Sequence, residues 1–196
     1  RELKELGFEV MLWVCPFVSP DSDTYRELEK EGVFMLDSMD KPAMVRWWNG
    51  VSAVLDLTNS KGNKWFKGEL DRLVNQYGVS GFKLDAGDAR FYKGISSSKK
   101  VIPNTHTELF NKIGLDYPFN EYRATWKMGG QPLVQRLHDK GHDWEDIKKL
   151  IPQMVLEGIM GYPFSCPDMI GGGQFTAFLN DAPIDQELVV RSAQVH

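Results

Sequence analysis

The chain has 196 residues, of which 42% are hydrophobic and 26% charged, values typical of a globular domain large enough to bury a core. Its formal net charge of −4 argues against a nucleic-acid partner, because binding to a phosphate backbone requires a basic surface. No apolar run approaches the ~18 residues that a membrane span needs. The composition therefore argues against nucleic-acid-binding and membrane-spanning classes.

The first elements predicted along the chain are a short helix and a strand. Residues 1–6 have helical spacing and stop at Gly7, a candidate helix cap. Residues 10–14 form an almost wholly apolar run that contains Trp13. Such a run favours a strand that is buried on both faces.

The next segment, residues 19–63, is polar and punctuated by proline and glycine. A stretch of this length is too long for a simple connection within a compact domain, and long excursions are usually functional. We therefore expect an irregular insertion here. It carries Trp47 and Trp48, followed by an apolar run over residues 51–57.

From residue 63 onward, helices alternate with short apolar strands. An amphipathic helix over 63–77 is followed by Gly78 and then by a strand over 79–84, which is the unit from which parallel sheets are built. Asp143 is the predicted N-cap of a later helix, and Pro152 inside it predicts a local kink. The remaining predicted elements are helices over 107–113, 143–159 and 186–194, and strands over 122–126, 133–138 and 160–164.

Successive strand–helix units fit either an open doubly wound sheet or a (β/α)8 barrel. No glycine-rich phosphate fingerprint follows any strand, which disfavours a dinucleotide-binding fold. Asp85, Asp139 and Asp168 instead follow three of the strands. In a barrel such strand ends converge on one mouth, where active sites lie.

We therefore predict an α/β fold, an incomplete (β/α)8 TIM barrel that occupies residues 1–196 and has its insertion, at about 19–63, after an early strand. About five strands are recognisable, whereas a whole barrel needs eight strands and ~250 residues. The missing strands are expected to precede Arg1 and to follow His196.

The three aspartates together are stronger evidence for a functional site than any one of them alone. An aspartate after a strand is commonly a turn residue, and for any one of the three aspartates alone a turn role would be the favoured interpretation. Three at the same end of parallel strands favour a functional site. A glycosidase needs two carboxyl groups flanking the scissile bond, and Asp85 and Asp139 can supply them from different strands.

Several motifs resemble one enzyme family. Residues 81–88, Gly-Phe-Lys-Leu-Asp-Ala-Gly-Asp, resemble the nucleophile strand of glycoside hydrolase family 31. Residues 54–59 and 64–66 resemble the stretch before the preceding helix. Residues 161–172 look like the family's late-strand segment, and 187–191 resemble the helix that follows. The resemblance covers essentially the whole chain, and the motifs occur in the family's order.

This resemblance implies roles for individual residues. Asp85 matches the nucleophile. Residues 136–139 are similar to the corresponding region in the branch that includes the myogenesis-regulating glycosidase, which implies that Asp139 is the acid/base and Arg123 the arginine of the site. Asp143 is a rival acid/base, and its alternative role is the helix N-cap.

Other residues are candidates for binding the substrate, a carbohydrate. Lys83 shares a strand face with Asp85, so it can keep that carboxylate ionised, bind a hydroxyl, or form a structural salt bridge. Asp168 would hold sugar hydroxyls. Aromatic rings suit the apolar C–H face of a pyranose, with core packing as their alternative role. The candidates for such a wall are Trp13, Trp47, Trp48 and Phe164.

The resemblance implies a retaining α-glycoside hydrolase that acts on a terminal α-linked hexose by double displacement, without a cofactor. The chain lacks the Trp-x-Asp-Met-Asn-Glu form of the nucleophile motif common in α-glucosidases, so both α-galactosides and α-glucosides are candidate substrates. The spacing of His106, His138 and His142 matches no standard metal site. The competing interpretation is a non-catalytic sugar-binding relative or an inactive fragment. The oligomeric state is left open.

Overall fold

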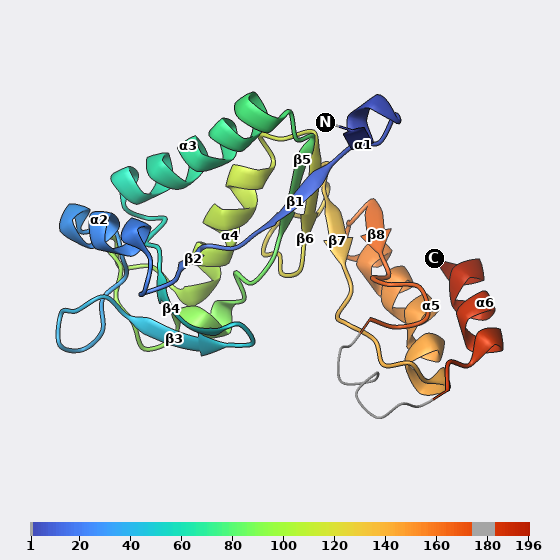
Figure 1. Cartoon of the computed structure of the whole chain (residues 1–196). Coiled ribbons are helices and arrows are strands. Elements are labelled where there is room, and N and C mark those ends of the chain that lie inside the picture. Colours follow the sequence, from blue (N-terminus) through green and yellow to red (C-terminus); the bar gives the residue numbers. More distant parts are fainter. Residues whose placement is uncertain (1, 174–182) are drawn as a thin grey trace. The chain divides into compact units, whose positions relative to one another are not determined.

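The computed structural model describes residues 2–173 and 183–196, which belong to two compact units (Figure 1). The first unit contains the chain up to Asn120 together with Ala124–Lys127. The second contains Glu121–Arg123 and the chain from Met128 onward.

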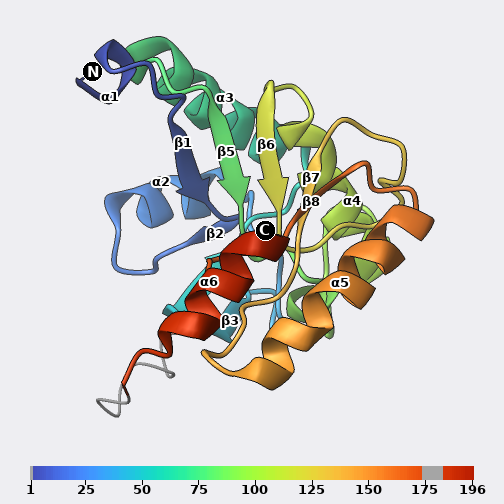
Figure 2. The same ribbon diagram turned by 90° about the vertical axis from the view of Figure 1, so that its right-hand side faces the viewer.

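The first unit combines a parallel pair of strands with a small antiparallel sheet. Strand β1 (Met11–Val14) pairs in parallel with β5 (Gly81–Leu84), and Figure 2 shows the two arrows side by side. The antiparallel sheet has the order β2-β4-β3. Its strands are β2 (Phe17–Val18), β3 (Met44–Trp47) and β4 (Gly50–Val54). The helices are α1 (Glu2–Glu5), α2 (Asp23–Glu31), α3 (Ser60–Tyr77), the short 3-10 helix η1 (Ala89–Tyr92) and α4 (Pro103–Gly114).

Helix α3 begins and ends at residues whose side-chain chemistry favours a boundary. The side chain of Asn59 accepts a hydrogen bond from the backbone N–H of Lys61 at 2.9 Å, and Gly78 ends the helix with a left-handed φ of 66°. Phe66 packs against Phe110 of α4, with ring centroids 5.9 Å apart. The predicted helix over 63–77 is therefore confirmed, with an earlier start at Ser60.

The segment 19–63 is not irregular, so that expectation was wrong. It forms α2 and two strands of the antiparallel sheet. Ser22 caps α2 by accepting a hydrogen bond from the backbone N–H of Tyr25, and Gly32 ends the helix. Strands of only four or five residues between tight turns give a weak periodic signal, which is why the sequence pattern did not predict them. The core of this part consists of Phe17, Met35, Ala43, Trp47, Val54, Ala86, Phe91 and Tyr92.

Strand β1 occurs where it was predicted, but it is not buried on both faces. Its residues are half-buried or exposed, and 45% of Trp13 is exposed. Within the described residues β1 is the edge strand of its sheet, with β5 as its neighbour. An apolar run alone does not distinguish an edge strand from a central one.

The second unit is built on parallel strands that two helices accompany. Strand β6 (Phe119–Tyr122) passes from the first unit into the second, where its end pairs with β7 (Val134–Arg136), which in turn pairs with β8 (Phe164–Cys166). Helices α5 (Trp144–Ile159) and α6 (Gln186–Val195) lie side by side in Figures 1 and 2. The core of this unit consists of Leu137, Ile147, Leu150 and Leu188.

Two predicted strands are displaced in the structure. The predicted strand over 122–126 is instead β6, because the backbone of Ala124 and Trp126 hydrogen-bonds to the side chain of Asn111 at 2.9 and 3.1 Å. The predicted strand over 160–164 is instead β8. Gly161 adopts a φ of 89° in the turn that closes α5, so the chain extends only afterwards. The strand over 133–138 is confirmed in its central part.

The two helices of the second unit have the predicted caps or bounds. Asp143 accepts a hydrogen bond from the backbone N–H of Asp146 at 2.8 Å and caps α5, as predicted. Pro152 lies inside α5, and the helix continues through it. Asp185 caps α6, which confirms the helix predicted over 186–194.

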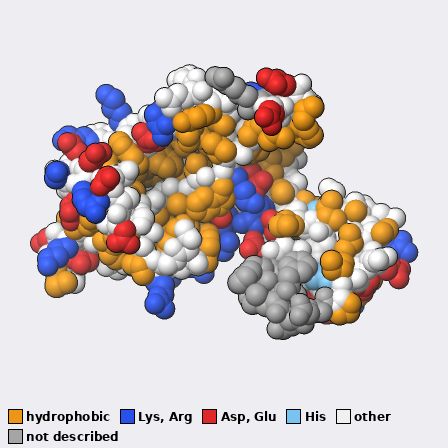
Figure 3. Space-filling model, in the orientation of Figure 1, with side chains coloured by type: hydrophobic (Ala, Val, Ile, Leu, Met, Phe, Trp, Pro, Cys, Tyr) orange, Lys and Arg blue, Asp and Glu red, His pale blue; other side chains and the backbone are white. Residues whose placement is uncertain are grey.

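The surface of the first unit mixes both signs of charge. In Figure 3 its visible face carries interspersed acidic and basic side chains with hydrophobic areas between them. In the described part of the chain, no helix has the length and apolar character to span a lipid bilayer.

Candidate active site

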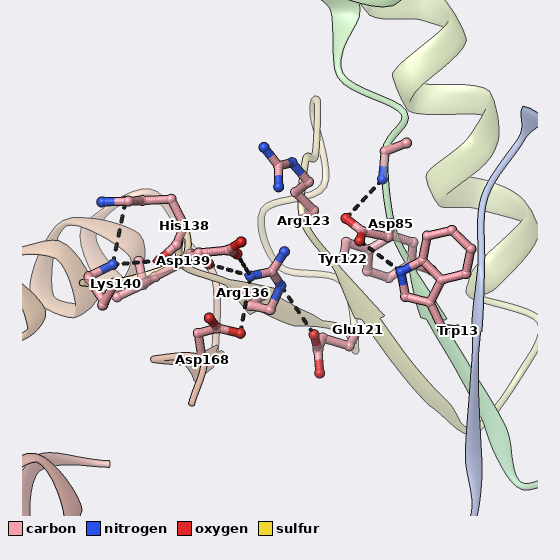
Figure 4. A network of polar contacts seen from close by, with 12 residues as sticks. Trp13, Asp85, Glu121, Tyr122, Arg123, Arg136, His138, Asp139, Lys140 and Asp168 are labelled. Atoms are coloured by element: carbon pink, nitrogen blue, oxygen red, sulfur yellow. Dashed lines mark hydrogen bonds and ion pairs between the residues drawn. The ribbon is translucent and has the colours of Figure 1, made fainter. Parts of the chain in front are cut away.

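Asp85 lies immediately after β5, and its side chain is held on both oxygens. Its backbone N–H donates to the carbonyl of Val14 at 2.9 Å, which extends the parallel ladder by one residue. Oδ2 accepts a hydrogen bond from the indole Nε1 of Trp13 at 2.7 Å, and Oδ1 accepts one from the backbone N–H of Ala86 at 2.9 Å (Figure 4). Only 7% of Asp85 is exposed. The carboxylate therefore has a fixed orientation in a largely buried position.

A sharp turn after Asp85 fixes the backbone that carries it. Ala86 and Gly87 both adopt left-handed conformations, with φ of 57° and 74°. The hydroxyl of Thr107 on α4 donates to the carbonyl of Gly87 at 2.6 Å. A Cβ atom at Gly87 would lie 2.7 Å from Phe110 Cδ1, closer than real Cβ contacts allow. The turn is therefore bonded to α4 and closely packed against it.

Three tryptophans of the first unit, Trp13, Trp47 and Trp48, form a connected aromatic group. The rings of Trp13 and Trp47 are stacked, with centroids 6.1 Å apart and an interplanar angle of 11°. Trp48 meets Trp47 edge-on at 5.0 Å. Trp47 is buried in the core and donates to Ser52 at 3.1 Å, whereas Trp13 and Trp48 are about half exposed. Trp47 therefore packs in the core, whereas Trp13 and Trp48 present exposed aromatic surface.

Lys83 is placed on the same side of the parallel pair as these groups. The register aligns Trp13 with Lys83, and aligned residues of neighbouring strands point to the same face. Because side chains alternate along a strand, Asp85 points to that face as well. The short distance between Trp13 and Asp85 agrees with this assignment.

In the second unit, Asp139 and Asp168 converge on one arginine. Asp139 lies three residues after β7, and Asp168 lies two residues after β8. Nη1 of Arg136, the last residue of β7, lies 2.6 Å from Asp139 Oδ1 and 3.1 Å from Asp168 Oδ1 (Figure 4). The structure therefore brings two predicted site residues of the second unit together around a common cation.

Arg136 is a residue that the sequence reasoning did not assign to the site. Only 3% of its side chain is exposed, and its Nε lies 3.5 Å from Oε1 of Glu121, the acidic residue on β6. Arginine is almost never this buried unless it is paired. An arginine within a predicted apolar strand was the signal that could have revealed this role.

Lys140 is a second buried cation in this region. Its ammonium group donates to the backbone carbonyl of His138 at 2.8 Å, and the side chain is almost completely buried. Burial lowers the pKa of Lys140, and the carboxylates of Asp146 and Asp168 oppose that shift.

Arg123, Asp143 and Phe164 complete the predicted set in the second unit, and Phe164 is exposed at the start of β8. The backbone carbonyl of Arg123 accepts a hydrogen bond from Gln135 Nε2 at 3.2 Å, which anchors the residue next to β7. Asp143, the rival acid/base, uses its carboxylate to cap α5. The structure thus groups Trp13, Trp47, Trp48, Lys83 and Asp85 in the first unit, and Arg123, Asp139 and Asp168 in the second.

The three histidines considered as metal ligands have separate surroundings. His106 stacks on Tyr92 in the first unit, His138 lies beside Lys140, and His142 contacts the carbonyl of Gly171. Within residues 2–173 and 183–196, no three His, Cys, Asp or Glu side chains are grouped so that they could hold a metal ion.

Comparison with known proteins assigns the chain to a family. All of residues 1–196 match the model of the glycosyl hydrolases family 31 TIM-barrel domain. The chain belongs to this family. Membership confirms the predicted α/β class and the partial (β/α)8 barrel, whose five described parallel strands do not close.

Individual relatives agree with this assignment. The chain is 35% identical over 210 residues to the myogenesis-regulating glycosidase of Mus musculus, and 25% identical over 211 residues to the SITS-binding protein of Tetronarce californica. Each alignment covers all of this chain and 29% of the relative. The chain thus spans less than a third of the length of these proteins.

Solved structures show the same fold. The cycloalternan-degrading enzyme of Trueperella pyogenes in complex with isomaltose superposes with a TM-score of 0.83 at 21% identity, covering 98% of this chain and 29% of that one. A family 31 sulfoquinovosidase from E. rectale in complex with an aza-sugar inhibitor gives a TM-score of 0.82 at 22% identity, covering 98% and 31%.

Proposed function

We propose that the complete protein containing this chain is a retaining α-glycoside hydrolase that removes a terminal α-linked hexose, either galactose or glucose. The observation that carries the proposal is the carboxylate of Asp85. It lies at the end of a parallel strand, both of its oxygens have fixed donors, and it lies beside the half-exposed ring of Trp13. Family membership and the sugar-bound structural neighbours support the same activity.

In the first step of the proposed mechanism, Asp85 attacks the anomeric carbon while the glycosidic C–O bond breaks. Asp139 donates its proton to the departing oxygen, and a covalent glycosyl–enzyme results. In the second step Asp139 takes a proton from water, whose oxygen attacks the anomeric carbon and releases Asp85. One solved structure of the Trueperella pyogenes enzyme is described as a complex with a covalent intermediate, which supports this route.

The two carboxylates differ as their proposed roles require. Asp85 is largely buried and rigidly held, which suits a nucleophile that must approach one carbon atom along a fixed direction. Half of the Asp139 side chain is exposed, which suits a group that exchanges protons with water in each cycle. Retention of configuration predicts carboxyl groups roughly 5–5.5 Å apart, against 6.5–9.5 Å for inversion.

The remaining candidates would bind the sugar. Trp13 and Trp48 offer exposed aromatic surface to the apolar face of a pyranose. Lys83, Arg123 and Asp168 would bind hydroxyl groups through charge-assisted hydrogen bonds. Because only 7% of the Asp168 side chain is exposed, its share in sugar binding is limited to that exposed edge.

The proposal is tested by replacing Asp85 with Ala in the complete protein. Turnover of nitrophenyl α-galactoside and nitrophenyl α-glucoside should fall by at least about 10³-fold, because the substitution removes the group proposed to form the covalent intermediate. Asp21→Asn, an exposed acidic position before α2, is the matched control. Near-normal activity of a folded D85A protein would overturn the assignment, and the faster of the two substrates would identify the sugar.

The acid/base is tested by comparing Asp139→Asn with Asp143→Asn. D139N should lose about 10²- to 10⁴-fold in turnover of a disaccharide, whose leaving oxygen needs a proton. D143N should stay close to wild type in both activity and stability, because asparagine can cap α5 as aspartate does. The reverse result would move the acid/base role to Asp143.

A non-catalytic sugar-binding role is the second candidate, since one relative is named for binding, of SITS, and not for hydrolysis. In that case the wild-type protein would bind sugars saturably without turning over either nitrophenyl glycoside.

A further inference from the structure

Arg136 contacts acidic side chains that the proposed mechanism needs, but it is itself withdrawn from solvent. We propose that Arg136 is a positioning residue for the general-acid step, holding Asp139 in its proton-donating orientation and tying it to Asp168. This inference rests on the proposed function, since it presumes that Asp139 is the acid/base.

The geometry around the guanidinium supports a shared anchor. Nη1 carries two hydrogens and lies within reach of three acceptors: Asp139 Oδ1 at 2.6 Å, Asp168 Oδ1 at 3.1 Å and the carbonyl of Leu137 at 3.2 Å. Nε faces Glu121 at 3.5 Å. Because a guanidinium is planar and presents its donors in fixed directions, these contacts restrict where each carboxylate can lie.

Arg136 and Asp139 differ in how far their side chains are exposed to solvent. The side chains of Arg136 and Asp168 are 3% and 7% exposed, whereas that of Asp139 is 50% exposed. Arg136 therefore acts through Asp139 and does not itself reach substrate. Asp168 also adopts a left-handed φ of 80°, which is costly for a residue other than glycine and requires support from its surroundings. Its ion pair with Arg136 provides such support.

The charges explain why this anchor is compatible with acid catalysis. As a proton leaves Asp139, negative charge develops beside the guanidinium, which stabilises it electrostatically. The positive charge of Arg136 also faces the carboxylates of Glu121 and Asp168, which balance it even when Asp139 is neutral. Asp139 can therefore take up a proton between turnovers without leaving an unpaired buried cation.

The inference is tested with substrates that differ in their need for an acid. Fluoride leaves a glycosyl fluoride without being protonated, whereas a disaccharide needs a proton on its leaving oxygen. Arg136→Met should lower turnover of the disaccharide by about 100-fold or more and that of the fluoride by about tenfold or less. Arg136→Lys, which keeps one charge but not the planar geometry, should give an intermediate ratio. Arg26→Met, at an exposed pair with Asp23, is the control.

The ratio of the two rates is informative even for a partly unfolded variant, because both substrates are measured on the same sample. Equal losses for both substrates in R136M and R136K would overturn the positioning role. D139N distinguishes this outcome from failure of the proposed function. If D139N shows the same difference between substrates but the Arg136 variants do not, only the inference fails. If D139N shows no difference, the acid/base assignment itself is wrong.

Discussion

The indole nitrogen of Trp13 donates a 2.7 Å hydrogen bond to Oδ2 of Asp85, joining the ends of two neighbouring parallel strands 72 positions apart in the chain. The same ring stacks on Trp47, which anchors it to the core of the first unit. Trp13 thus presents an aromatic surface and also orients the proposed nucleophile, a role that the sequence analysis did not include.

Replacing Trp13 with Phe keeps an aromatic ring but removes the N–H donor. A hydrogen bond to a charged group contributes about 1.5–3 kcal/mol, so kcat/KM should fall by about 10- to 100-fold with a smaller effect on the melting temperature. Steady-state kinetics on a nitrophenyl glycoside measures the change. Trp126→Phe, at a partly exposed ring in the same unit, is the control. Wild-type kinetics for W13F would show that this hydrogen bond does not contribute to catalysis.

Substituting Gly87 with Ala should damage both stability and activity. The new methyl group would meet Phe110 at 2.7 Å, and the φ of 74° disfavours any residue with a Cβ. We expect a loss of about 1–3 kcal/mol in the free energy of unfolding, together with reduced turnover, because the turn carries Asp85. Gly68→Ala is a matched control: it lies inside α3 with open space around it, and it should stabilise the protein by about 0.5–1 kcal/mol. Equal effects of the two substitutions on denaturant unfolding would contradict this account.

The buried His106 predicts a pH dependence of stability. Burial lowers its pKa, and the carboxylate of Asp56 only partly opposes this shift. As the pH falls through about 6.5, His106 takes up a proton in the unfolded chain but not in the folded protein. The contribution of His106 to the free energy of unfolding is therefore fully present above that pH and is lost as the pH decreases. His106→Phe keeps the stacking on Tyr92 and removes the titration. The free energy of unfolding of H106F should fall less steeply than that of wild type between about pH 7.5 and 5. Parallel curves for the two proteins would exclude His106 as a source of the slope.

The cap of α3 at Asn59 was not predicted, but local sequence chemistry was sufficient for the end of that helix at Gly78 and for the cap of α5 at Asp143. A left-handed glycine or a capping side chain acts on backbone groups within a few residues. The strand that leads into Asp85 was likewise predicted from its apolar run. These features depend on interactions between neighbours in the chain, which the order of residues determines directly.

The sequence alone also identified the family and the aspartates that follow three strands. It did not reveal that segment 19–63 folds into α2 and two antiparallel strands, nor that Asn111 binds the backbone after β6 and displaces the predicted strand. Only the tertiary structure showed that Arg136 joins Asp139 to Asp168 and that Trp13 holds Asp85. Such pairs form between side chains far apart in the chain, and their contacts depend on strand register and burial, which no local pattern specifies.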